Sequence, residues 1–258
     1  GVQRREHTKQ GTRLLLSQHL SFTLVDPYYL LPLSLCLLGY LMVMYRTYVR
    51  QLAMSKQEAK LKVVIFLGST REGRLGDRVA KFVTKYLEST NHDVHLIDPV
   101  QLKLPLLEKP LFFYPDQSKA PKVLQETDRL IQDADAFVVV SCEYNHSIPP
   151  ALANTLDHFA PPHFAWRPSG IVTYSPGQFG GMRCAMQLRC MLGELGCLSV
   201  SNIFGIPKVH EALDEEGKPL NDYMKTGINT LVTQLDWHAT AMKRQREAVG
   251  VPPPPKPV

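Results

Sequence analysis

The feature that most constrains the fold is an apolar segment, residues 61–67, that leads through a short polar loop into an amphipathic segment at 76–89. The first segment is almost continuously apolar, which is typical of a parallel strand buried on both faces. In the second segment, apolar residues recur at the spacing of a helix that packs one face against a sheet. This order of strand, loop and helix predicts the first unit of an α/β fold.

The same alternation continues along the chain. Strands are predicted near 61–67, 93–98, 136–141, 170–175 and 198–204, and helices near 76–89, 121–133, 149–160, 181–196 and 221–247. These elements predict a doubly wound sheet of five parallel strands, with helices on both faces and right-handed crossovers. We therefore expect one domain over residues 61–248, preceded by an N-terminal segment at 1–60 and followed by a disordered proline-rich tail at 249–258.

The loop after the first strand has the composition of a phosphate site. Ser69 and Thr70 offer hydroxyls, Arg71 and Arg74 offer guanidiniums, and the following helix offers backbone N–H groups. The spacing fits neither a Walker loop nor the GxGxxG dinucleotide fingerprint. The loop predicts a bound phosphate ester, and the alternative is that the hydroxyls only cap the helix while the arginines are solvated.

Two further strand ends carry polar loops. Cys142 to Ser147 follow the third predicted strand, and Ser175 to Gly181 follow the fourth. Because parallel strands end at the same edge of a sheet, these loops are expected to meet the phosphate loop there, where open α/β folds bind ligands. Together the three loops predict a binding site for a flat, phosphorylated, hydrogen-bonding ligand.

Three strings in this order, GSTREGR, EYNHSIPPALANTLDH and YSPGQFGGMRCAMQLRCMLGELG, resemble the NADPH-dependent FMN reductase family of flavodoxin-like quinone, azo and chromate reductases. The resemblance covers about residues 61 to 220. It implies that the first loop holds the FMN phosphate, that the second lies along the flavin ring, and that the third lies at its far side. Arg74 and Gly76 depart from the residues common in the family, as does Cys142.

The resemblance implies FMN-binding residues in all three loops. They are Ser69, Arg71, Arg74, Leu75 and Gly76 in the first, Glu143, Tyr144, Asn145, His146 and Ser147 in the second, and Ser175, Gly177 and Gly180 in the third. No side chain is expected to act as a catalytic acid, base or nucleophile, because the cofactor carries the redox chemistry. No metal site is expected, because the cysteines lack metal-ligand spacing.

The implied function is an NAD(P)H-dependent FMN oxidoreductase. NADPH or NADH delivers hydride to bound FMN, and a quinone, azo or metal-type acceptor then takes the electrons. The resemblance also implies a homodimer or homotetramer. Two alternatives stay open: an FMN-binding electron carrier or redox-controlled interaction protein without robust turnover, and a protein that stores free flavin nucleotides.

The net charge of +5 comes entirely from residues 1–60, so the predicted domain gives no electrostatic indication of nucleic-acid binding. This segment is uncharged from Pro27 to Tyr45, and as a helix it would span about 28 Å, close to the apolar thickness of a bilayer. Basic residues dominate its C-terminal side, which predicts a cytoplasmic domain with a possible membrane anchor over 27–45. The alternative is that residues 1–53 do not belong to the mature protein, since Met54 is a plausible start.

Overall fold

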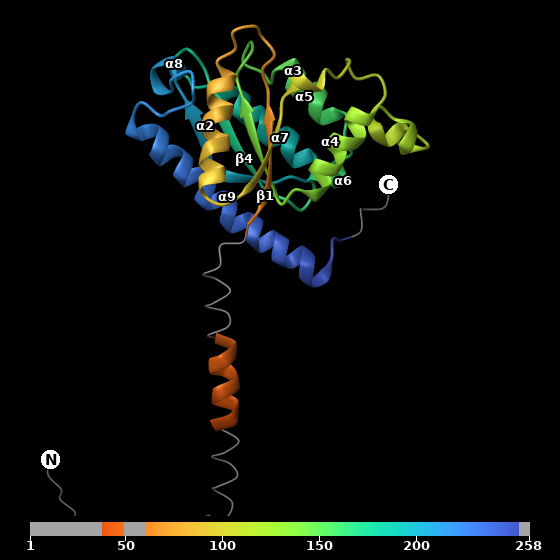
Figure 1. Cartoon of the computed structure of the whole chain (residues 1–258), viewed down its shortest axis with the longest axis vertical. Coiled ribbons are helices and arrows are strands. Elements are labelled where there is room, and N and C mark those ends of the chain that lie inside the picture. The colour runs from red at the N-terminus through yellow and green to blue at the C-terminus, as the bar shows by residue number, and fades with distance from the viewer. Residues whose placement is uncertain (1–37, 49–59, 253–258) are drawn as a thin grey trace, which may run out of the picture. The chain divides into compact units, whose positions relative to one another are not determined.

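The structure is a computed structural model that describes residues 38–48 and 60–252 of the 258-residue chain. The chain divides into two units, Gly1–Glu58 and Ala59–Val258. In the first unit, residues 38–48 form a helix whose described side chains are all exposed. The second unit contains the whole α/β fold (Figure 1).

The centre of the second unit is a sheet of five parallel strands in the order β2-β1-β3-β4-β5. The strands are β1 (Lys62–Leu67), β2 (Asp93–Ile97), β3 (Ala136–Ser141), β4 (Ser169–Tyr174) and β5 (Ser199–Ile206). Every residue of β3 and β4 is buried, which accounts for the continuous apolar runs in these segments. The expected five-stranded doubly wound sheet is confirmed.

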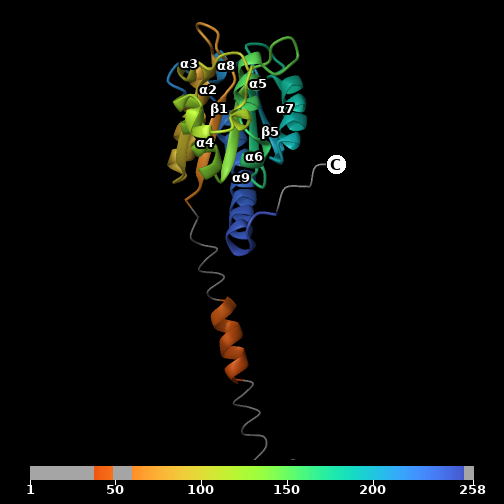
Figure 2. The same cartoon turned by 90° about the vertical axis from the view of Figure 1, so that its right-hand side faces the viewer.

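Helices cover both faces of this sheet. They are α2 (Gly76–Ser89), α3 (Pro99–Leu102), α4 (Lys122–Asp133), α5 (Pro150–Asp157), α6 (Pro161–Phe164), α7 (Met182–Glu194), α8 (Val209–Ala212) and α9 (Asp222–Val249). One apolar core joins α2 and α9 to the sheet, and a second core joins α4, α5, α6 and α7 to it. The long helix α9 extends past the sheet, as the view turned by 90° also shows (Figure 2).

One helix differs from the sequence expectation. The helix expected at 149–160 ends at Asp157, and a separate short helix, α6, starts at Pro161, because proline within a helix interior would remove a backbone hydrogen bond. The connection from β2 to α4 contains α3 and two short 3₁₀ turns. Asn154 of α5 holds this connection by bonding the Leu107 N–H and the Pro105 carbonyl.

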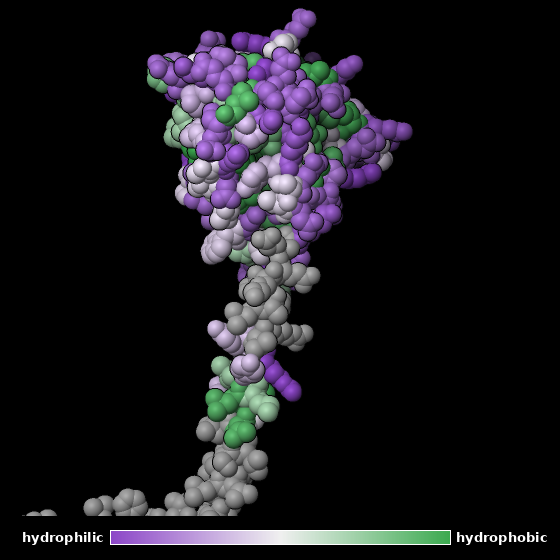
Figure 3. Space-filling model, turned by 60° about the vertical axis from the view of Figure 1, so that its left-hand side comes forward, coloured by the Kyte–Doolittle hydropathy of each residue, from purple (hydrophilic) through white to green (hydrophobic). Residues whose placement is uncertain are grey.

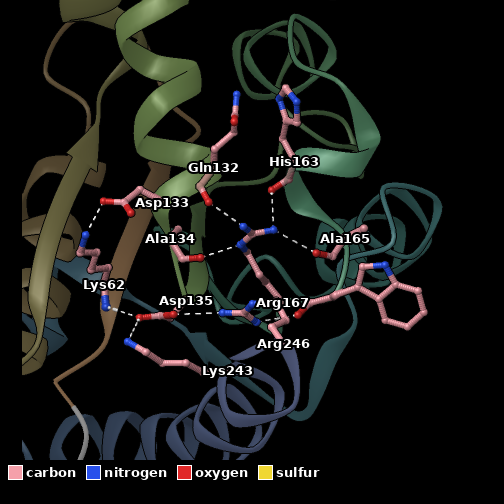
Figure 4. Close-up of polar contacts among 11 residues, drawn as sticks. Lys62, Gln132, Asp133, Ala134, Asp135, His163, Ala165, Arg167, Lys243 and Arg246 are labelled. Atoms are coloured by element: carbon pink, nitrogen blue, oxygen red, sulfur yellow. Dashed lines mark hydrogen bonds and ion pairs between the residues drawn. The ribbon is translucent and has the colours of Figure 1, made fainter. Parts of the chain in front are cut away.

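The amino-terminal edge of the sheet carries a network of paired charges, which we call the Asp135 cluster (Figure 4). Asp135, directly before β3, accepts hydrogen bonds from the Lys62 N–H, the Lys243 ammonium and the Arg246 guanidinium. The last two residues belong to α9. Nearby, the Arg167 guanidinium donates to four backbone carbonyls, those of Gln132, Ala134, His163 and Ala165. The cluster therefore ties α9 and the turns before β3 and β4 to the base of the sheet.

The membrane anchor expected over 27–45 lies mostly outside the described residues. Its described part is the helix over 38–48, whose apolar side chains are on the surface (Figure 3). In the part of the chain that the structure describes, no helix is long and apolar enough to cross a membrane. Membrane contact through residues 27–45 stays a prediction.

Candidate functional site

The phosphate loop brings together two of the residues predicted to hold the cofactor phosphate. Ser69 follows β1 and is 3% exposed, and its hydroxyl lies 3.0 Å from the Tyr144 hydroxyl of the second loop. The Arg71 guanidinium lies 3.8 Å above the centre of the Tyr144 ring. Arg71 forms no ion pair within the described residues 38–48 and 60–252. Its guanidinium is therefore available to an anion.

Arg74, also predicted to hold the phosphate, has partners within the protein. Its guanidinium forms a two-point ion pair with Asp98, at 2.8 and 2.6 Å, and a further ion pair with Asp77 at 2.7 Å. It also donates to the Ser69 carbonyl. Burial acts to raise the pKa of Asp98, but the hydrogen bonds from Arg74 and from the Val100 N–H lower this pKa below its ordinary value. Arg74 thus stabilises the first loop, and most of its N–H groups already donate to Ser69, Asp77 and Asp98.

The remaining two residues of the first loop mark the start of α2. Leu75 occupies the position before the helix and packs against the core, and Gly76 is its buried first residue. A Cβ atom at Gly76 would overlap the Tyr174 hydroxyl, which approaches from the end of β4. Glycine is therefore required here by the close approach of a neighbouring strand.

The second loop is a tight turn. The N–H and carbonyl groups of Tyr144 and Ser147 bond to each other at 3.2 and 2.9 Å. Asn145 and His146, the exposed residues between them, both have positive φ values of 50° and 63°. This is the geometry of a two-residue type I′ turn. The two backbone hydrogen bonds define the shape of this loop.

Glu143 anchors this turn to α7. Its carboxylate accepts the backbone N–H groups of Arg183 and Cys184, at 3.0 and 3.1 Å, and also pairs with the Arg183 guanidinium. Burial acts to raise the pKa of Glu143, but the hydrogen bonds from Arg183 and from the Cys184 N–H lower it below its ordinary value. Gln187 adds a second connection, since its amide bonds the Ser147 hydroxyl and the His146 carbonyl. Glu143 therefore faces α7 and holds the turn in place.

The third loop closes on itself. The Ser175 hydroxyl donates to the Gly177 carbonyl and accepts the Gly180 N–H at 3.0 Å. Gly180 has a φ of 59°, and a Cβ there would lie 3.1 Å from the Ile206 nitrogen, so only glycine fits easily. This loop ends at the start of α7, beside Glu143. All three predicted loops therefore lie at the carboxyl edge of the sheet.

Comparison with known proteins identifies the family. The model of the family described as NADPH-dependent FMN reductase matches residues 61–211. The chain belongs to the NADPH-dependent FMN reductase family.

Relatives of known name agree with this assignment. The quinone reductase of Escherichia coli (strain K12) is 32% identical over 136 residues, which cover 52% of this chain and 70% of that protein. The NAD(P)H-dependent FMN reductase LOT6 of Saccharomyces cerevisiae is 28% identical over 146 residues, covering 52% of this chain and 75% of that protein. Among solved structures, the flavoenzyme NAD(P)H:(acceptor) oxidoreductase FerB of Paracoccus denitrificans shares the fold. It has a TM-score of 0.60 at 21% identity and covers 69% of this chain and 98% of FerB.

Family membership makes this chain an oxidoreductase of the FMN and NAD(P)H class. The residues at the site fit an FMN phosphate. Arg71 stacks on Tyr144 but forms no ion pair among the described residues, and the buried Tyr174 hydroxyl has no hydrogen-bond partner among them. Sequence reasoning missed Asp98, Gln187 and Tyr174. The sequence could have indicated Asp98, because it lies at the end of a predicted strand, at the same edge of the sheet. No sequence pattern points to Gln187 or Tyr174.

Proposed function

We propose that this chain is an NAD(P)H-dependent FMN oxidoreductase that passes hydride equivalents to a quinone, azo or metal-type acceptor. The observation that carries the proposal is the contact between Ser69, Arg71 and Tyr144. These residues join the loops after β1 and β3 at the carboxyl edge of the sheet. Parallel α/β sheets bind their ligands at this edge. The family assignment indicates that the ligand is FMN.

FMN, when bound, supplies the redox chemistry, accepting hydride from the nicotinamide and passing the electrons on. In our proposal the chain binds and orients it. Ser69 and Arg71 hold the phosphoryl group, assisted by the positive end of the α2 helix dipole. Arg74 and Asp98 keep the loop in shape, and the backbone of the turn at 144–147 lies beside the flavin ring.

Glu143 and the third loop complete the proposed site. The carboxylate of Glu143 fixes the turn against α7, so that the ring meets a rigid wall. The loop with Ser175, Gly177 and Gly180 forms the opposite boundary. Beside it, the exposed side chains of Phe179 and Met182 offer an apolar surface on which a planar acceptor stacks after the nicotinamide has left. Turnover by this route is of the ping-pong type.

The proposal is tested by replacing both phosphate ligands. The double variant Ser69→Ala/Arg71→Ala is expected to bind FMN about 100-fold more weakly, because it loses charge-assisted hydrogen bonds. Its affinity for riboflavin, which lacks the phosphate, should change little. The matched control is Ser118→Ala/Arg129→Ala, at exposed positions outside the three loops. Equal FMN affinity in wild type and the Ser69/Arg71 variant would contradict the site assignment.

The activity is tested on the FMN-loaded protein without oxygen. Addition of NADPH or NADH should bleach the flavin absorbance within seconds, and a quinone should then restore it. A flavin band that persists in the presence of both nucleotides would contradict the proposal and favour an electron carrier. The physiological acceptor is then found by comparing quinones, azo compounds and oxidised metals as the second substrate. The oligomeric state and the cytoplasmic location stay predictions.

A further inference from the structure

Tyr174, the last residue of β4, has an unusual environment. Its side chain is 3% exposed, and its hydroxyl is buried without a hydrogen-bond partner among the described residues. Other tyrosines of this domain do bond their hydroxyls: Tyr86 to Asn229 and Tyr223 to the Gly205 carbonyl. Buried hydroxyls are nearly always paired. The Thr84 and Ser169 hydroxyls are also unpaired among the described residues, but of the three only Tyr174 lies at the carboxyl end of a strand, where the proposed ligand binds.

The Tyr174 hydroxyl points into the phosphate end of the proposed site. It lies against Gly76, the first residue of α2, where no other residue type would leave it room. Its polar neighbours are the Ser69 hydroxyl and the Cys142 thiol, at the ends of β1 and β3. Burial and the neighbouring Cys142 raise the pKa of Tyr174, so the hydroxyl keeps its proton and is a donor at any physiological pH.

The Ser69 hydroxyl is the neighbour best suited to accept a hydrogen bond from Tyr174. A serine hydroxyl has one proton to donate and two lone pairs to accept. Tyr144 already bonds Ser69 at 3.0 Å, in a contact where either hydroxyl can donate, and burial raises the pKa of Tyr144, so this second tyrosine also keeps a proton that it can donate. When both tyrosines donate to Ser69, the serine proton is left for a third group. A phosphoryl oxygen, which accepts but does not donate, is the group that requires it.

We propose that Tyr174 is a positioning residue for the FMN phosphate: it donates to Ser69, and with Tyr144 it directs the Ser69 proton toward the phosphoryl group. This inference rests on the proposed function. It adds a residue that acts through Ser69, together with the reason for glycine at position 76. Hydrogen bonds in such a chain strengthen one another, so the loss of the outer donor weakens the contact at its inner end.

The test uses the full-length chain and the variant Tyr174→Phe, which removes only the hydroxyl. The FMN dissociation constant is expected to rise about five- to tenfold, while that of riboflavin stays unchanged. The melting temperature of the FMN-free variant is measured as well, so that a loss of phosphate binding is told apart from a loss of fold. The matched control is Tyr86→Phe, which removes the same atom elsewhere and should leave the affinities for both flavins as they are. Unchanged FMN affinity in Tyr174→Phe, or an equal loss for FMN and riboflavin, would overturn the proposal.

A double-mutant cycle separates action through Ser69 from direct contact. In the Ser69→Ala background, Tyr174→Phe is expected to have no further effect on FMN affinity, because the group it positions is gone. If the two losses multiply, Tyr174 does not act through Ser69 and the proposal is wrong. If the wild-type protein binds no FMN at all, the proposed function fails, and this inference fails with it. If the wild-type protein binds FMN and the Tyr174→Phe variant binds it equally well, only this inference fails.

Discussion

The two edges of the sheet use polar groups in opposite ways. At the amino-terminal edge, the carboxylate of Asp135 has three donors and the guanidinium of Arg167 has four acceptors (Figure 4). At the carboxyl edge, Arg71 has no ion pair within the described residues and the buried Tyr174 hydroxyl has no partner there. The comparison indicates that the saturated Asp135 cluster holds the fold together, whereas the incompletely satisfied groups at the carboxyl edge can gain binding energy from a ligand.

The largest effect on stability is expected at Asp135. Replacement by alanine removes a buried carboxylate and leaves the half-buried Lys243 and Arg246 without their counter-charge, which should lower the free energy of unfolding by about 3 kcal/mol. The measurement is urea unfolding of the FMN-free protein. The control is Asp133→Asn, two residues earlier, which removes an exposed ion pair with Lys62 and should cost less than about 1 kcal/mol. Similar losses in both variants would remove the distinction between the two edges.

Arg167 gives the next largest effect. Methionine at this position keeps the apolar stem but leaves four backbone carbonyls without their donor, so the free energy of unfolding should fall by about 3 kcal/mol or less. Lysine keeps the charge but lacks the planar guanidinium, so the Arg167→Lys variant is expected to have a free energy of unfolding between those of the methionine variant and the wild type. Calorimetry of the three proteins gives the order. A methionine variant as stable as wild type would show that the carbonyls find other partners.

Glu143 tests the comparison of the two edges, because its carboxylate lies at the carboxyl edge and yet accepts several hydrogen bonds. Its carboxylate accepts the first N–H groups of α7 and pairs with Arg183, so Glu143→Ala should release the turn at 144–147. We expect FMN to bind about tenfold more weakly, with a loss of about 1 kcal/mol in unfolding free energy. Glutamine, which still accepts a helix N–H, should recover part of the affinity. The result is measured by fluorescence titration, and wild-type affinity in Glu143→Ala would show that Gln187 alone holds the turn.

These contacts also show what the sequence could predict. The bounds of α2 were predicted as observed, at 76 and 89, because its apolar residues repeat with helical period and one face packs on the sheet. The helix expected at 149–160 was too long, although Pro161 signalled a new start. Local patterns therefore located most elements, since each element mainly buries its own apolar side.

The partners of the polar side chains were not predictable in this way. Arg74 pairs with Asp98, which lies 24 positions later and comes near only through the pairing of β1 with β2. The carboxylate of Glu143 accepts a backbone N–H of α7, 40 positions later. Which acceptor a guanidinium or N–H group finds depends on tertiary register, and a single sequence does not contain that information in any short motif.

The smallest effect concerns the pH dependence of the Arg74–Asp98 pair. The pKa of Asp98 is lowered in the folded protein, so its stabilising contribution is complete above the unfolded-state value of about 3.9 and is lost as pH falls. The stability difference between wild type and Asp98→Asn should therefore hold at neutral pH and shrink between about pH 5 and pH 3, by about 1 kcal/mol or less. Asp77→Asn, which removes the exposed partner of the same arginine, should cost little at either pH. Because Arg74 donates to the Ser69 carbonyl, FMN affinity is expected to follow the same trend. A difference that grows toward pH 4 would mean that protonated Asp98 is the form the fold prefers, and that the phosphate loop is not supported by this ion pair.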